Sequence, residues 1–123
     1  MDKGDCIIYS GSIFTIEWYY DKTGYSQAYG YFVETSQEQK RKFLVLIKKM
    51  GDFGKIYDKT KFTYEGDKIY AFKPQPDRYL SFFTKDKKII VTNAFQKKTQ
   101  KMPRTEKELA IKNMNTYNSR GGK

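Results

Sequence analysis

The sequence predicts an α+β fold: a twisted antiparallel sheet with an N-terminal helical hairpin and a C-terminal helix, in the order βααβββα. Three observations predict this class. First, apolar and polar residues alternate in an early segment. Next, two segments have apolar residues at helical spacing. Finally, three strand-like segments follow one another with short connectors. Because 123 residues with 17% aromatic content can bury one core, we expect a single domain over residues 1–123.

The first strand is predicted by strict alternation in the segment 13–20. Ile16 and Trp18 are among the residues that would share its buried face, and polar residues alternate with them. Residues 1–12 are expected to form a lead-in without regular structure, and residues 21–24 form a predicted turn.

Two short helices are predicted next. Ser26 is the expected N-cap of the first, which should cover about residues 26–35. Ser36 and Gln39 fit a capping box for the second helix, and Gly51 is expected to end it. Two helices in such close succession predict a helical hairpin.

Three strand-like runs cover residues 67–73, 78–84 and 88–95, after a predicted loop at 51–61. Their connectors are too short for helical crossovers, so the runs should form an antiparallel meander. In a meander, the end of the third strand lies beside the start of the second and the end of the first. Residues at these three positions should therefore converge at one end of the sheet.

The final helix is predicted at about residues 105–118. Thr105 and Glu108 fit a second capping box at its start. Residues 119–123 are expected to be a frayed tail.

The strongest compositional signal is charge. The chain has 24 Lys and Arg residues against 14 Asp and Glu residues, a formal net charge of +10. The excess lies after residue 40, since residues 1–40 contain more acidic than basic side chains. A basic domain of this size indicates a polyanionic partner, most often nucleic acid. The alternative is a lysine-rich surface with no particular ligand.

The missing residue types exclude several chemistries. There is no histidine, so a Ser-His-Asp triad and a Cys-His pair are impossible. The one cysteine, Cys6, allows neither an intrachain disulfide nor a Cys/His zinc site, and we expect no metal and no cofactor. No apolar run is long enough to span a membrane and no signal-peptide pattern is present, so a cytoplasmic location and no membrane partner are expected.

Residues 91–103, VTNAFQKKTQKMP, form a distinctive segment, in which a predicted strand ending in an aromatic residue is followed by basic residues and a proline. This segment resembles the RelE/HigB superfamily of toxins from type II toxin–antitoxin pairs, most closely its phage-derived HigB-like branch. The segments 20–26, 69–73 and 78–83 are similar to the opening strand and turn and to two later strands of that superfamily.

The resemblance implies a microbial-ribonuclease-like domain with helices on one side of a twisted antiparallel sheet. It implies an endoribonuclease, or mRNA interferase, that cuts mRNA on the ribosome and so inhibits translation. The implied partners are mRNA, the ribosome and a cognate antitoxin, often a small helix-turn-helix protein. Ala71 stands where relatives often have Glu, and Lys73 stands where they usually have Arg. The alternative is therefore a catalytically inactive RelE-fold protein of prophage origin that binds RNA or the ribosome; a phage accessory protein is a third possibility.

The meander predicts a cationic site independently of the resemblance, because Lys73, Arg78, Lys97 and Lys98 should converge. We expect Arg78 and Lys73 to hold a phosphate and Lys97 or Lys98 to transfer protons. Lysine can act as a base where burial and neighbouring cations lower its pKa. The candidates for RNA binding are Tyr79 and Phe95, which could stack on bases, and Thr99, Gln100 and Lys101. Each could instead have an ordinary role in the core or in a solvated turn.

Overall fold

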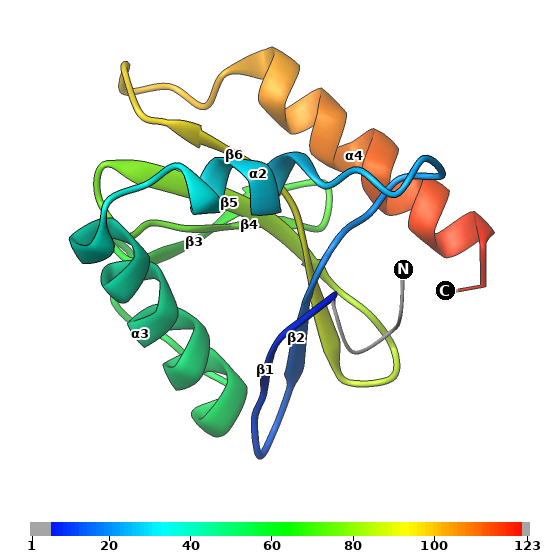
Figure 1. The fold of residues 1–123 in the computed structure, drawn as a ribbon, viewed down its shortest axis with the longest axis horizontal. Coiled ribbons are helices and arrows are strands. Elements are labelled where there is room, and N and C mark those ends of the chain that lie inside the picture. Colours follow the sequence, from blue (N-terminus) through cyan, green and yellow to red (C-terminus); the bar gives the residue numbers. More distant parts are fainter. Residues whose placement is uncertain (1–5, 122–123) are drawn as a thin grey trace.

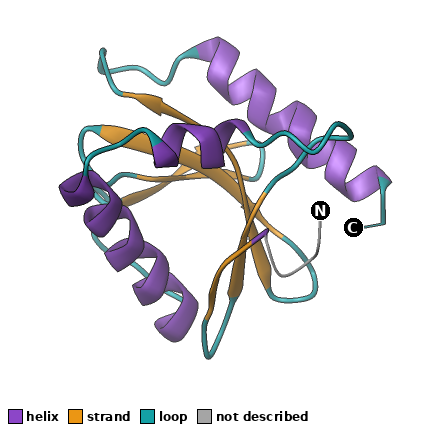
Figure 2. Cartoon of the chain, in the orientation of Figure 1, coloured by secondary structure: helices purple, strands orange, loops and turns teal. Residues whose placement is uncertain are grey.

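The computed structural model describes residues 6–121, which form a six-stranded sheet with helices on both faces (Figures 1 and 2). The strand order is β1-β2-β6-β5-β4-β3. The strands are β1 (Ile7–Ser10), β2 (Thr15–Trp18), β3 (Phe62–Gly66), β4 (Ile69–Phe72), β5 (Asp77–Phe83) and β6 (Lys88–Gln96), and the helices are α2 (Gln27–Val33), α3 (Gln37–Phe53) and α4 (Arg104–Ser119).

The sheet is mixed, which corrects the expectation of a purely antiparallel one. The predicted meander is present as β4, β5 and β6, which pair antiparallel. However, β2 pairs with β6 in parallel, with Thr15 opposite Lys88 and Trp18 opposite Val91. The helices α2 and α3 lie between β2 and the meander in sequence, and this long connection allows the chain to return in the same direction.

Two strands were not predicted. β1 lies in the expected lead-in and pairs antiparallel with β2, while β3 follows the expected loop and pairs antiparallel with β4. Both are four or five residues long, lie at the edges of the sheet and have mixed burial, so neither has the clean alternation that identifies a strand. Residues 1–5 of the lead-in lie outside the described residues.

The two faces of the sheet carry different helices, which corrects the expectation that all helices pack on one side. Trp18, Phe43 and Tyr79 belong to the core between the sheet and the α2–α3 hairpin. Leu80 and Met114 belong to a second core beneath α4. Figure 1 shows α3 and α4 on opposite sides of the sheet.

The helical hairpin forms largely as predicted. The capping box is confirmed, since the Ser36 side chain accepts from the Gln39 amide and the Gln39 side chain accepts from the Ser36 amide. The predicted stop at Gly51 is wrong, because α3 continues to Phe53 and ends at Gly54, whose φ of 75° is left-handed. A Cβ on Gly51 would lie 2.8 Å from the Tyr9 ring, so this glycine permits close packing rather than a helix end.

The ends of α4 differ from the prediction. The helix begins at Arg104 with Pro103 at the N-cap position and no side-chain cap, so the expected box of Thr105 and Glu108 is wrong. Thr105 is already inside the first turn. After the helix, the Arg120 guanidinium donates hydrogen bonds to the Tyr19 hydroxyl and the Tyr20 carbonyl. The tail predicted to be frayed is therefore held in place as far as Arg120. Residues 122–123 lie outside the described residues.

Candidate functional site

Three strand ends meet where the sequence predicted their convergence. Phe72 at the end of β4 pairs with Tyr79 of β5, and Asp77 at the start of β5 pairs with Gln96 at the end of β6. The chain beyond β6 is tied to the same place, because the Lys97 amide donates to the Pro76 carbonyl at 2.9 Å. The residues that follow β4, begin β5 and follow β6 therefore surround one point.

A pocket opens at this point, and five cationic side chains converge on it from three segments of the chain. Its lining residues are Glu65, Lys73, Arg78, Phe95, Lys97, Lys98, Thr99, Gln100, Lys101, Met102 and Pro103. All four expected catalytic candidates line it, as do four of the five expected RNA-binding residues. A pocket lined by so many cations is electrostatically suited to an anion.

Arg78 is the most firmly positioned cation of the pocket. Its side chain is only 6% exposed, and its Nη1 donates to the Gln75 side chain at 3.2 Å and to the Asp77 carbonyl at 3.0 Å. Burial lowers the pKa of the guanidinium, and the nearby carboxylates of Glu65 and Asp77 oppose this shift. Arginine stays charged in proteins, so the structure presents a fixed cation at the pocket wall.

Lys73 has a different electrostatic environment. Partial burial lowers the pKa of its ammonium, the cations of Arg78 and Lys97 lower it further, and only Glu65 opposes the shift. Its Nζ donates to the Lys59 carbonyl at 3.2 Å. A lysine whose charged form is disfavoured can give up its proton nearer to neutral pH, which favours a base over a simple phosphate contact.

Glu65 was missed by the sequence analysis. It is the one carboxylate among the described lining residues, and it comes from β3, beside a register shift between Tyr64 and Gly66. No motif marks it, because its place in the pocket depends on the pairing of β3 with β4, and β3 itself was not predicted.

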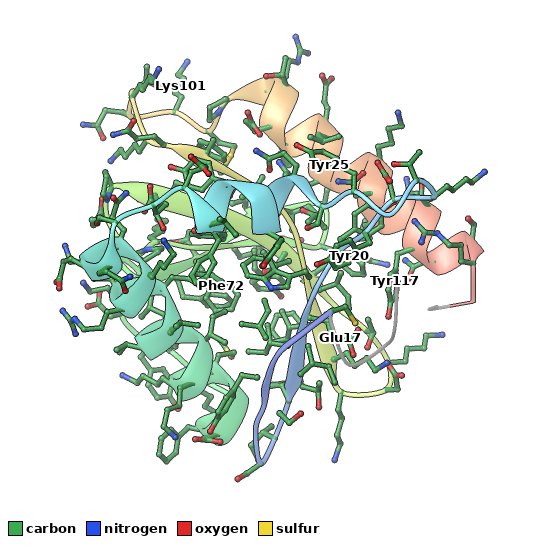
Figure 3. All side chains as sticks on the ribbon, in the orientation of Figure 1. Glu17, Tyr20, Tyr25, Phe72, Lys101 and Tyr117 are labelled. Atoms are coloured by element: carbon green, nitrogen blue, oxygen red, sulfur yellow. The ribbon has the colours of Figure 1, made fainter. Side chains whose placement is uncertain are left out.

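The segment between β6 and α4 forms the outer wall of the pocket. Lys97, Lys98, Gln100 and Lys101 are exposed, and the Thr99 hydroxyl donates to the Lys101 carbonyl at 3.1 Å. Figure 3 shows Lys101 at the outer end of this segment, far from the buried Phe72. Such side chains can adjust to a ligand, unlike the fixed guanidinium beneath them.

The two expected base-stacking residues have different surroundings. Phe95 is half-buried, packs beside the core beneath α4 and lines the pocket. Tyr79 points to the opposite face, where it is 1% exposed with its ring centroid 4.0 Å from that of Phe43. A ring without an exposed face cannot stack on a base, so the expected role of Tyr79 is corrected to a core residue.

A buried polar network supports the pocket from behind. The Asp77 carboxylate is fully buried and accepts hydrogen bonds from the Tyr31 hydroxyl at 2.5 Å and from the Gln39 amide at 3.0 Å. Burial and this carboxylate together raise the pKa of Tyr31. The network ties both helices of the hairpin to the residue next to Arg78.

A second support joins α2 to β6. The Gln27 side chain donates to the Ala94 carbonyl at 2.9 Å and accepts from the Ala94 amide at 2.7 Å. β6 extends past the last residue of β2, so this amide replaces the backbone partner that a neighbouring strand would supply. The end of β6 that leads into the pocket is thereby held in place.

Within the described part of the chain, no helix combines the length and apolar character needed to cross a membrane. Across residues 6–121, no group of three or more His, Cys, Asp and Glu side chains gathers as a metal site would require.

The fold and the pocket together define a small basic α+β domain with a cationic pocket at one end of its sheet. The family model described as "Phage derived protein Gp49-like (DUF891)" matches residues 30–115, more than half of the chain. The chain therefore belongs to the phage-derived Gp49-like family, which is associated with RelE-like toxins. No curated protein matches the chain.

Proposed function

We propose that this protein is the toxin of a type II toxin–antitoxin pair, of the HigB-like branch of the RelE/HigB superfamily, and that it cleaves mRNA on the ribosome. The observation that carries the proposal is the pairing of Lys73, whose pKa is lowered, with the fixed cation Arg78 in one pocket. The family and the exposed basic segment after β6 support it. The cell would then stop translating while the toxin is free.

The proposed reaction is an attack of the RNA 2′-hydroxyl on the adjacent phosphorus. Neutral Lys73 accepts the 2′ proton, the new bond forms between O2′ and phosphorus, and the bond from phosphorus to O5′ breaks. Arg78 stabilises the negative charge on the non-bridging oxygens. Lys97 or Lys98 donates a proton to the leaving O5′, and the products are a 2′,3′-cyclic phosphate and a 5′-hydroxyl.

The structure favours catalytic roles that differ from those expected from the sequence. The sequence predicts that Lys73 helps to hold the phosphate and that Lys97 or Lys98 transfers protons. The lowered pKa of Lys73 makes it the better base, and its neighbour Arg78 is the better phosphate ligand. Phe95, at the same pocket, is the remaining candidate for stacking on a base.

The proposed inhibitor is a small antitoxin, in this branch a helix-turn-helix protein. The +10 net charge and the cationic pocket favour an acidic antitoxin segment that covers the pocket. Such a segment would neutralise the same cations that hold the RNA.

A second candidate is a RelE-fold protein that binds RNA or the ribosome without cleaving RNA. Ala71 favours it, because this residue is fully buried in the core beneath α4 and supplies no carboxylate where relatives often have one. Glu65 opposes it, since this residue brings a carboxylate into the pocket from the neighbouring strand.

The deciding experiment maps RNA 5′ ends across the transcriptome minutes after the gene is induced alone in bacteria. The control is the Lys73→Ala/Arg78→Ala variant. We expect new ends inside translated frames, in phase with codons and absent from the control. Normal growth without new ends would favour the inactive binder, and growth arrest without new ends would indicate a different target.

A further inference from the structure

A second basic surface lies at the C-terminal end of α3 and along the segment that leads to β3. It consists of Lys49, Phe53, Lys55, Tyr57, Lys59 and Lys61, and we call it the α3–β3 surface. All six side chains are exposed. Its two aromatic rings are unusually open for such large apolar groups, with Phe53 73% and Tyr57 81% exposed.

The lysines of this surface outnumber the carboxylates near them. Among residues 6–121, no carboxylate oxygen lies within 4.0 Å of the ammonium nitrogen of Lys55, Lys59 or Lys61. The nearby Asp58 is engaged in its own turn, where it accepts hydrogen bonds from the Thr60 amide and hydroxyl. The surface therefore presents net positive charge to its surroundings.

The surface is continuous and reaches the pocket. The ammonium groups of Lys49 and Lys61 both help to lower the pKa of Asp58, which places the end of α3 and the following segment within one electrostatic neighbourhood. Lys55 lies over the ring of Tyr57, 5.9 Å from its centroid. At the other end, the Lys59 carbonyl accepts the hydrogen bond from Lys73 in the pocket.

We propose that the α3–β3 surface binds the single-stranded RNA that flanks the scissile phosphate. This inference rests on the proposed RNA-cleaving function. Proteins hold single strands with cations along the backbone and exposed aromatic rings on which bases stack, and this surface has both. An acidic protein segment would use the lysines but leave the two open rings without a specific role.

The test is fluorescence anisotropy with two 2′-O-methyl RNAs, which lack the attacking hydroxyl and stay intact. One has about four nucleotides and can occupy the pocket alone; the other has about sixteen and can also reach the α3–β3 surface. The variant is Lys55→Ala/Lys61→Ala. The matched control is Lys22→Ala/Lys112→Ala, which removes the same charge from exposed lysines outside this surface. Circular dichroism of each variant verifies the fold.

We expect the Lys55→Ala/Lys61→Ala variant to bind the long RNA at least about 5-fold more weakly and to bind the short RNA as the wild type does. For this variant and the long RNA, the slope of log affinity against log salt should be smaller in magnitude by about 1.4 than for the wild type, because two phosphate contacts are lost. Tyr57→Ala should weaken long-RNA binding about 5-fold or more through lost stacking, and Tyr57→Phe should restore it.

If the variant and its control lose equal affinity for the long RNA, the inference is overturned, because the loss would then reflect the lower net charge of the whole protein and not its position. The inference also fails if the variant loses affinity for polyglutamate but keeps its affinity for the long RNA, since the surface would then serve an acidic protein. A failure of the proposed function is distinguishable. If the pocket does not bind RNA, Lys73→Ala/Arg78→Ala would leave binding of the short RNA unchanged, whatever the α3–β3 surface does. If the pocket binds RNA without cleaving it, this variant would still weaken binding of the short RNA, and mapping of RNA 5′ ends would show no new ends.

Discussion

Lys73 and Arg78 show how two cations in one pocket acquire different properties. Arg78 is nearly buried and held by hydrogen bonds to Gln75 and to the Asp77 carbonyl, so its geometry is fixed before a ligand arrives. Lys73 is less constrained, but burial and two neighbouring cations disfavour its charged form. Fixed geometry suits charge stabilisation, and a lowered pKa suits proton transfer.

The first prediction concerns the pH dependence of RNA cleavage. The base must be neutral, so the rate should rise with pH as Lys73 loses its proton, with a midpoint below the ordinary lysine value of 10.5. Lys73→Arg keeps the charge but cannot lose it, so we expect a rate loss of about 100-fold or more and no rise. Single-turnover cleavage at a series of pH values is the measurement. An unchanged profile in Lys73→Arg would remove Lys73 as the base.

The second prediction concerns Glu65. Its carboxylate raises the pKa of Lys73, so Glu65→Gln should shift the midpoint of the same pH profile to lower pH. The loss of one negative charge from the pocket should also tighten RNA binding at low salt. If Glu65 were itself the base, cleavage would instead fall at every pH, and the two outcomes separate the roles.

At the scale of elements, the turn between β1 and β2 approaches α3 so closely that only glycine fits. A Cβ on Gly11 would lie 2.2 Å from the backbone carbon of Gly51. The amides of Ile13 and Phe14 both donate to the Gly51 carbonyl, at 2.8 and 2.9 Å. This contact joins the edge of the sheet formed by β1 to the C-terminal part of α3.

The third prediction follows from this contact. Gly11→Ala should lower the free energy of unfolding by about 3 kcal/mol, because the backbone of α3 cannot move aside at little cost. The matched control is Gly30→Ala in α2, where a Cβ meets nothing within 4 Å. That change should raise stability by about 0.5–1 kcal/mol through helix propensity. Urea unfolding of both variants measures the difference, and similar effects in the two would contradict the close approach.

The helical hairpin and the start of β5 are coupled by the buried Asp77 carboxylate. Tyr31 of α2 and Gln39 of α3 both donate to it, so one side chain fixes two helices relative to the pocket. Gln39 also completes the capping box with Ser36, which positions its amide for this second contact.

The fourth prediction is a double-mutant cycle on that network. Asp77→Ala should destabilise the protein by about 1–3 kcal/mol, since the Tyr31 hydroxyl loses its partner while partly buried. Tyr31→Phe should cost less, and the two changes should couple by about 0.5–3 kcal/mol. Chemical denaturation of the two single variants and the double variant gives the coupling. Additive effects would show that the hydrogen bond contributes no stability of its own.

At the scale of the whole molecule, the charge distribution would govern the proposed encounter with RNA. The net charge of +10 and the pocket of five cations favour rapid, salt-sensitive association with a polyanion. The pocket lies where the residues that follow β4, begin β5 and follow β6 meet, and Figure 1 shows the segment after β6 extending from this end of the sheet.

The fifth prediction is the salt dependence of RNA binding. If each of the five pocket cations contacts one phosphate, the slope of log affinity against log salt should be about −3.5. Lys73→Ala/Arg78→Ala should reduce the magnitude of that slope by about 1.4. Anisotropy titrations over a range of salt concentrations provide the test, and salt-independent binding would contradict a phosphate-dominated interface.

Features that arise from local patterns could be predicted from the amino-acid sequence. The alternation in the segment 13–20, the strand-like runs with short connectors, the Ser36 and Gln39 capping box and the helical spacing were sufficient to predict the α+β class and most of the elements. Strand adjacency in a meander is a matter of connector length, so the convergence of Lys73, Arg78 and Lys97 could also be predicted.

Features that depend on contacts between distant segments could not be predicted in this way. The parallel pairing of β2 with β6 and the short edge strands follow from the assembled sheet, because edge pairing leaves little trace in hydrophobic alternation. Glu65 could not be predicted as a lining residue for the same reason, because it comes from the edge strand β3. Tyr79 directly follows Arg78 on the central strand β5, so its side chain points to the opposite face of the sheet and belongs to the core beneath the α2–α3 hairpin. The pKa of Lys73 likewise depends on burial and on neighbours that only the folded chain brings together.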